Sequence, residues 1–211
     1  MMSPLRYTLV ADGTSDRCLV HIVNWSLAQL ISSFVPQVAS PSLLRSVHHA
    51  QRLQAAVLQY PCDLLLIHRD AENQGVEVRM EEIRDLTSQG NLPPHVPIIP
   101  IRMTEAWLLF DEPAIRSAAD NPRGTMSLNV PHLANLESLP DPKNTLWNLM
   151  LAASGKNGRR LAQFKRDLFS RRQRVAELIS DFSPLRTLSA FVLFEEALRS
   201  AVNQWSQENL A

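Results

Sequence analysis

Short apolar runs alternate with longer amphipathic stretches over the first half of the chain, which is the pattern of an α/β fold. Strands are predicted at residues 6–11, at the continuous apolar run 64–67, and at 96–102, where two prolines place the strand near an edge of the sheet. Apolar positions at helical spacing predict helices at residues 16–35 and 43–60, and the charged, weakly apolar residues 75–89 predict a solvent-facing helix. Residues 36–42 are expected to form a loop or a short edge strand. Strands that alternate with helices in this way favour a parallel sheet.

The second half of the chain is predicted to be helical. Thr104 is suited to cap a helix through Phe110, and Asp111 to cap the next one. Proline, asparagine and serine are frequent in residues 121–142, as in a loop. Helical spacing returns at residues 147–153, 158–180 and 188–207.

We therefore expect one domain over residues 1–211. Its α/β core, residues 1–120, would hold a mostly parallel sheet of about four strands flanked by helices. A loop-rich and then helical extension would follow over residues 121–211. With 45% apolar residues in 211, the chain can bury one good core.

Composition narrows the function classes. The formal net charge is zero, which gives no global reason to expect a polyanionic partner. Cys18 and Cys62 have neither zinc-site nor redox-motif spacing, so we expect buried thiols and a reducing compartment. The sequence shows no signal-peptide pattern and no apolar run long enough for a membrane span. We expect a cytoplasmic protein without a membrane partner.

Acidic residues follow two of the predicted strands. Asp12 comes directly before Gly13 after the first strand, and Asp70 and Glu72 follow the second. The carboxyl ends of parallel strands meet at one edge of the sheet, where ligands bind. Carboxylates gathered there are costly unless a positive charge lies among them, and a hard divalent cation is the usual one.

The spacing of these acids suits a metal ion. In an extended chain, Asp70 and Glu72 point to the same side and can chelate one Mg²⁺, while Asp12 completes the site. The alternative is that Asp12 and Asp70 cap the following helices. Glu105, which follows the third predicted strand, is a further carboxylate at the same edge, and three such strand ends exceed what capping requires.

Several segments carry a resemblance to a known family. The run Asp12-Gly13-x-x-Asp16, with Asp70-x-Glu72 after an aliphatic strand, resembles the signature of TOPRIM domains. Residues 98–111, Ile-Ile-Pro-Ile-Arg-Met-Thr-Glu-Ala-Trp-Leu-Leu-Phe-Asp, are similar to the central motif of the DUF4276 family. Asp141-Pro-Lys143 and parts of residues 182–198 are similar to that family too. The likeness covers nearly the whole chain.

The resemblance implies a TOPRIM-like fold and Mg²⁺-dependent phosphodiester chemistry, with Mn²⁺ as a substitute ion, related to that of topoisomerases, primases and OLD-type nucleases. It also implies a bacterial protein that works beside a partner ATPase in phage defence. Asp12 stands where TOPRIM domains usually have Glu, and Glu72 where they usually have Asp. The implied catalytic residues are Asp12, Asp70, Glu72 and Glu105, of which the first three hold the metal.

The competing hypothesis is non-enzymatic. A degenerate TOPRIM fold could serve as a regulatory or scaffold subunit that keeps its acids for metal or partner binding. Two further residues stay open at this point. Asp16 either contacts a ligand or pairs with Arg17 or Arg102, and Arg69 either contacts a phosphate or neutralises the acids.

Basic residues are concentrated in one stretch. Eight of the chain's 21 lysines and arginines lie between Lys156 and Arg174. This stretch either tracks a nucleic-acid backbone or is a solvated, acid-paired helix face. The candidate nucleic-acid contacts are Lys143, Lys156, Arg159, Arg160, Lys165 and Arg166. For Lys143 a loop salt bridge is the alternative.

Overall fold

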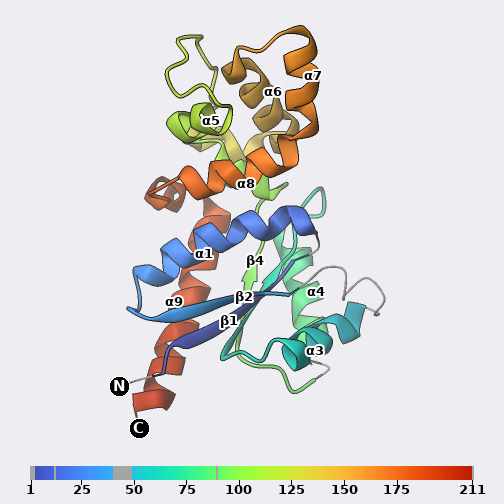
Figure 1. The fold of residues 1–211 in the computed structure, drawn as a ribbon. Coiled ribbons are helices and arrows are strands. Elements are labelled where there is room, and N and C mark those ends of the chain that lie inside the picture. The colour runs from blue at the N-terminus through green and yellow to red at the C-terminus, as the bar shows by residue number, and fades with distance from the viewer. Residues whose placement is uncertain (1–2, 12, 40–48, 89, 211) are drawn as a thin grey trace.

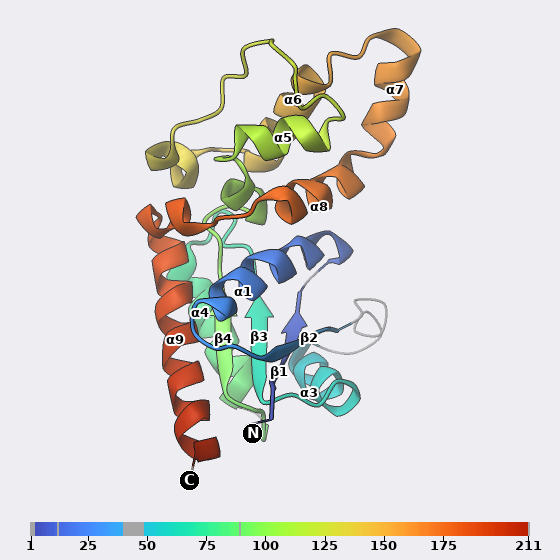
Figure 2. The ribbon, with the colours of Figure 1, turned by 60° about the vertical axis from the view of Figure 1, so that its left-hand side comes forward.

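The computed structural model describes residues 3–11, 13–39, 49–88 and 90–210. Four parallel strands form one sheet in the order β2-β1-β3-β4. Their bounds are β1 Leu5–Val10, β2 Phe34–Val38, β3 Leu64–His68 and β4 His95–Ile98. The α/β class and the parallel four-stranded sheet expected from the sequence are confirmed. All four carboxyl ends lie at the same edge of this sheet (Figure 2).

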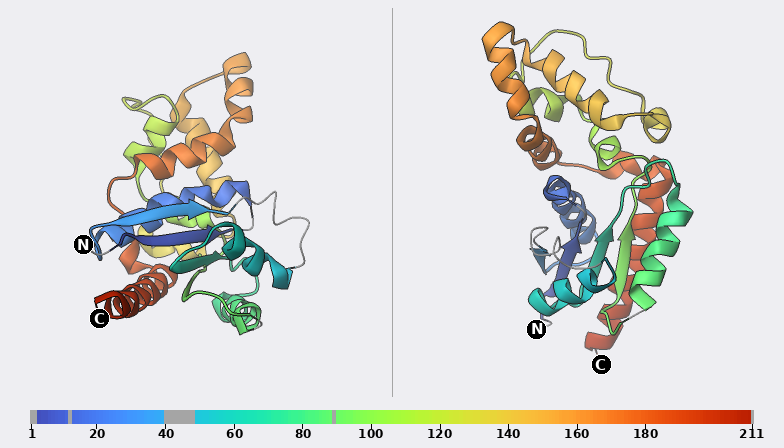
Figure 3. Two further views of the ribbon diagram at one scale, coloured as in Figure 1. Left: turned by 60° about the horizontal axis from the view of Figure 1, so that its bottom comes forward. Right: turned by 90° about the vertical axis from the view of Figure 1, so that its right-hand side faces the viewer.

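Helices cover both faces of the sheet. Leu9 and Leu66 face the short helix η1, Thr14–Cys18, with α1, Leu19–Ala28, and also α9, Ser189–Leu210. Val10 and Ile67 face α3, His49–Gln59, and α4, Val76–Ser88. The side chains of each strand alternate between these two layers. Because α9 runs beside β4, the end of the chain belongs to the α/β layer (Figure 3).

A second group of helices lies above the carboxyl edge of the sheet (Figure 1). Its elements are η2 Thr104–Leu108, α5 Glu112–Ala118, η3 Leu133–Ser138, α6 Pro142–Ser154, α7 Gly158–Arg166, α8 Leu168–Leu178 and η4 Ser183–Thr187. Of these, α8 packs directly on η1 and α1. One apolar core continues from the sheet into this group. The described helices include none that is long and apolar enough to cross a bilayer.

Some predicted boundaries are wrong for identifiable reasons. The helix expected over residues 16–35 ends at Ala28, because Phe34–Val38 pairs with β1 as an edge strand. The helix expected over residues 158–180 is two helices that meet at Asp167. The cap at Asp111 is confirmed, since its carboxylate accepts a 2.8 Å hydrogen bond from the Ala114 amide.

The two cysteines differ in burial. Cys18 is fully buried at the end of η1, as expected, and burial raises the pKa of its thiol to about 12. Cys62 is half-buried and free. Burial is also the main cause that raises the pKa of the Cys62 thiol.

Candidate functional site at the carboxyl edge of the sheet

Asp70 is placed by an extension of β3 beyond its last residue. The chain stays hydrogen-bonded to the segment after β4, and the Ala71 amide donates to the Pro100 carbonyl at 3.0 Å. This pairing brings Asp70 beside the first residue of η2. Its Oδ1 accepts hydrogen bonds from the Thr104 amide, at 2.8 Å, and from the Thr104 hydroxyl, at 3.1 Å.

Asp70 therefore caps η2 from the neighbouring strand. Thr104 was expected to cap this helix itself, and that prediction is wrong, because its hydroxyl is directed to Asp70 and to His68. His68 Nε2 also lies 3.2 Å from Asp70 Oδ1. All three contacts fix the same carboxylate oxygen.

The second oxygen of Asp70 takes part in none of these contacts, and 28% of the side chain is exposed. Burial alone would raise the pKa of Asp70, but His68 and Thr104 outweigh it and hold the pKa below its ordinary value. Asp70 is thus an ionised, oriented carboxylate at the edge where α/β sheets bind ligands.

Arg172 on α8 lies beside two other acids at this edge. Its side chain is only 2% exposed, and its Nη2 lies 3.4 Å from Asp16 Oδ1. Its Nη1 donates to Glu105 Oε1, and Glu105 is itself buried. Asp16 Oδ2 accepts a 3.0 Å hydrogen bond from the Gly13 amide and lies 3.8 Å from His68 Nδ1. These contacts join five side chains into one polar cluster, which we call the strand-end cluster: Asp16, His68, Asp70, Glu105 and Arg172.

Arg172 is the positive charge of the strand-end cluster. Burial alone would lower the pKa of Arg172, but Cys18, Glu105 and Asp16 outweigh it and the pKa is raised. The sequence predicted a divalent cation held by Asp12, Asp70 and Glu72, with Glu105 beside them. In the structure, a guanidinium from the helical group fills that electrostatic role for Asp16 and Glu105.

The described residues do not by themselves fit a metal site. Glu72 has a left-handed backbone, φ 51°, and its exposed side chain lies 3.0 Å from Arg79 on α4. Its side chain thus pairs with α4, whereas the Asp70 side chain contacts Thr104 on η2. Asp12 lies outside the described residues. Within residues 3–11, 13–39, 49–88 and 90–210, no group of three or more His, Cys, Asp or Glu is arranged to hold a metal ion.

The sequence left the partners of Asp16 and Arg69 undecided, and the structure shows an ion pair for each. Asp16 pairs with Arg172 rather than with the two arginines considered for it. Arg102 instead donates to Asn73. Arg69 lies 3.3 Å from Glu82 on α4.

The basic stretch divides into exposed and engaged residues. Four side chains of α7 are exposed, and among the described residues they have no acidic partner: Arg159, Arg160, Lys165 and Arg166. Lys156 instead lies 3.2 Å from Asp120 and over the ring of Phe164. Lys143 lies over the rings of Trp147 and Phe169. Helix α7 stands at the end of the helical group remote from the sheet (Figures 1 and 2).

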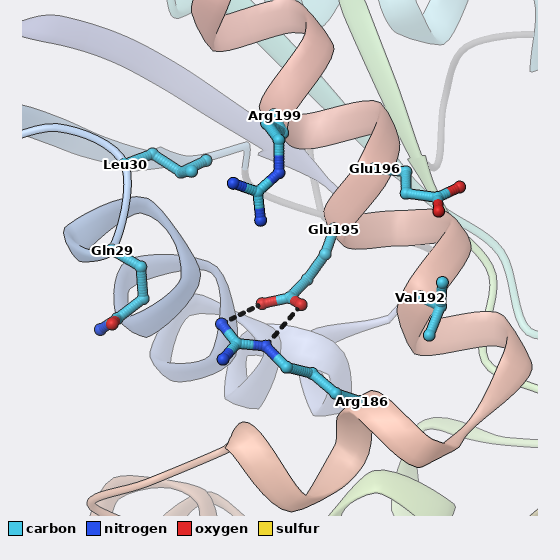
Figure 4. Close-up of a pocket in the computed structure, with 7 residues that line it drawn as sticks. All are labelled: Gln29, Leu30, Arg186, Val192, Glu195, Glu196 and Arg199. Atoms are coloured by element: carbon cyan, nitrogen blue, oxygen red, sulfur yellow. Dashed lines mark hydrogen bonds and ion pairs between the residues drawn. The ribbon is translucent and has the colours of Figure 1, made fainter.

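A separate pocket lies between the end of α1 and α9 (Figure 4). Its volume is about 570 Å³. Arg186 and Glu195 form a two-bond ion pair across it, at 2.8 and 3.0 Å. Glu196 and Arg199 also line it, so its charges balance. None of the acids predicted as catalytic lines this pocket.

Comparison with known protein families, with curated proteins and with solved structures finds no match to this chain. The resemblance of its motifs to TOPRIM domains and to the DUF4276 family stays a prediction. What the structure defines is an α/β protein whose acids at the carboxyl edge of a parallel sheet are held by an arginine from a helical layer.

Proposed function

We propose that the protein is a TOPRIM-like hydrolase of nucleic-acid phosphodiesters that acts at the strand-end cluster. The observation that carries the proposal is the state of Asp70. Three contacts fix one of its oxygens, its pKa is held low, and its other oxygen is left for a substrate or an ion. Asp111 also caps a helix with one oxygen only, so what sets Asp70 apart is its place at the edge of the sheet where α/β proteins bind ligands.

In this proposal Asp70 is the group that touches the reacting centre, and Thr104 and His68 position it. The exposed basic side chains of α7 support a polyanionic substrate, because each phosphate contact adds favourable, salt-dependent binding. Dependence on Mg²⁺ or Mn²⁺, which the resemblance implies, is a separate arm of the test, since the described residues do not complete a metal site.

The test is cleavage of supercoiled plasmid and of tRNA in EDTA, Mg²⁺ or Mn²⁺. We expect Asp70→Asn, which keeps the shape of the side chain, to lower the cleavage rate by at least about 100-fold. The matched control is Glu81→Gln, an exposed acid on α4, which should cleave at the wild-type rate. Equal rates for wild type and Asp70→Asn would refute the proposal.

The second candidate is a regulatory or scaffold subunit for a partner ATPase in phage defence. Arg172 favours it, because an arginine already pairs with both Asp16 and Glu105 and makes a metal less necessary there. The same assay separates the two functions when it is repeated with ATP and with an ATPase encoded beside this gene. Absence of cleavage under every condition, together with stable binding to that ATPase, would establish the scaffold and exclude the hydrolase.

A further inference from the structure

A second cavity, of about 530 Å³, opens beside the strand-end cluster. It is formed by η1, the start of α1, the carboxyl end of β2 and α8. Its lining residues are Arg17, Val20, His21, Pro36, Val38 and Gln173. Its size lies within the range of about 300–1,000 Å³ that is usual for ligand pockets.

The cavity and the strand-end cluster lie on two sides of the same chain segments. Asp16 and Arg172 point inward and pair with each other. The residues that follow them, Arg17 and Gln173, line the cavity. A single wall, formed by η1 and α8, therefore separates the cavity from the strand-end cluster.

The charges around the cavity suit an anion. Arg17 is exposed, and in the described part of the chain it has no acidic partner. None of the described residues that line the cavity is an acid. Glu177 acts on the lining residue His21, but its effect on the His21 pKa is smaller than that of burial, and Glu177 is itself paired with Arg174 at 2.8 Å. The pocket in Figure 4 has a similar volume, but its two glutamates cancel its two arginines.

The remaining lining residues suit a nucleobase. Val20, Pro36 and Val38 supply apolar surface, and the Gln173 amide can both donate and accept hydrogen bonds. Burial lowers the pKa of His21, more strongly than Glu177 raises it, so its imidazole is neutral near pH 7 and also offers one donor and one acceptor. Single-stranded nucleic acid is recognised by this combination of a phosphate contact with an apolar and hydrogen-bonding base contact.

We propose that this cavity binds one nucleotide of the nucleic-acid substrate, with Arg17 on a phosphate and the base against Val20 and Val38. The inference rests on the substrate class of the proposed function, and it adds where a nucleotide beside the cleaved bond is held. His21 then contacts the edge of the base.

The first measurement is fluorescence anisotropy with a fluorescein-labelled single-stranded RNA in EDTA. We expect Arg17→Ala to weaken binding roughly tenfold, the scale of one hydrogen bond to a charged group. Arg199→Ala is the matched control, because it removes one exposed arginine from the pocket in Figure 4, and binding should change much less. Equal losses in the two variants, or no binding by the wild-type protein, would overturn the inference.

The second measurement does not depend on any variant. The full chain is irradiated with single-stranded RNA that contains 4-thiouridine, and the crosslinked peptides are identified by mass spectrometry. Crosslinks at residues 17–21 or 36–38 support the site, and crosslinks confined to α7 refute it. Both measurements need no cleavage, so a protein that binds here but never cleaves would refute the proposed hydrolase and leave this site standing.

Discussion

Replacement of Arg172 by methionine is expected to lower the free energy of unfolding by about 3–5 kcal/mol, the cost of removing one partner from a buried ion pair. Asp16 and Glu105 would keep their burial but lose their contacts with the Arg172 guanidinium. Methionine fills similar volume, so little of the loss would come from a cavity. Equilibrium unfolding in urea measures the difference.

The control for Arg172 lies two residues away. Arg174 also forms an ion pair, with Glu177 at 2.8 Å, but its side chain is 53% exposed. An exposed pair of this kind contributes about 1 kcal/mol or less, so Arg174→Met should change stability little. If both substitutions cost the same, burial of the Arg172 charge would not be the cause.

Replacement of Trp107 by alanine is expected to cost about 3–5 kcal/mol, since it leaves a large cavity in the core. Trp107 is fully buried in η2. Its ring packs edge-to-face on Phe191, with centroids 5.2 Å apart, and lies 6.0 Å from Phe194. Both phenylalanines belong to α9, so the tryptophan joins η2 to the helix that covers β4.

The position of η2 links this core residue to the strand-end cluster, because η2 carries Thr104 and Glu105. We therefore expect Trp107→Ala to lower cleavage as well as stability, measured by urea unfolding and by the plasmid assay on the same preparation. Trp147 on α6 is the control, since it is half-buried and packs on the exposed ring of Phe169. Equal destabilisation by Trp147→Ala would contradict the assigned role of Trp107.

Much of the fold follows from local patterns. The aliphatic runs of β1 and β3 can only be satisfied by burial on both faces, which is why the parallel sheet was predicted correctly. Asp111 was recognised as a cap, because the signal lies within one helical turn. The short strand β2 was missed in part, since its pairing with β1 is a tertiary contact rather than a local preference.

The contacts within the strand-end cluster were harder to predict from the sequence than the fold. Arg172 is separated along the chain from Glu105 by 67 residues and from Asp16 by 156, so no local motif indicates these partners. One available signal was its place on α8, because Val175 and Ala176 mark the buried face that continues from Arg172. His68 is visible in the sequence as a neighbour of Asp70, but its contacts with Thr104 and Asp16 are tertiary and could not be predicted from it.

The claim on which the site depends is that Arg172 and Glu105 stabilise each other inside one buried cluster. A double-mutant cycle with Arg172→Met, Glu105→Gln and the double variant measures that coupling directly. We expect a coupling energy of about 2–3 kcal/mol, so that the double variant is more stable than the sum of the single losses predicts. Additive losses would show that the two side chains act independently, and the strand-end cluster would not exist as described.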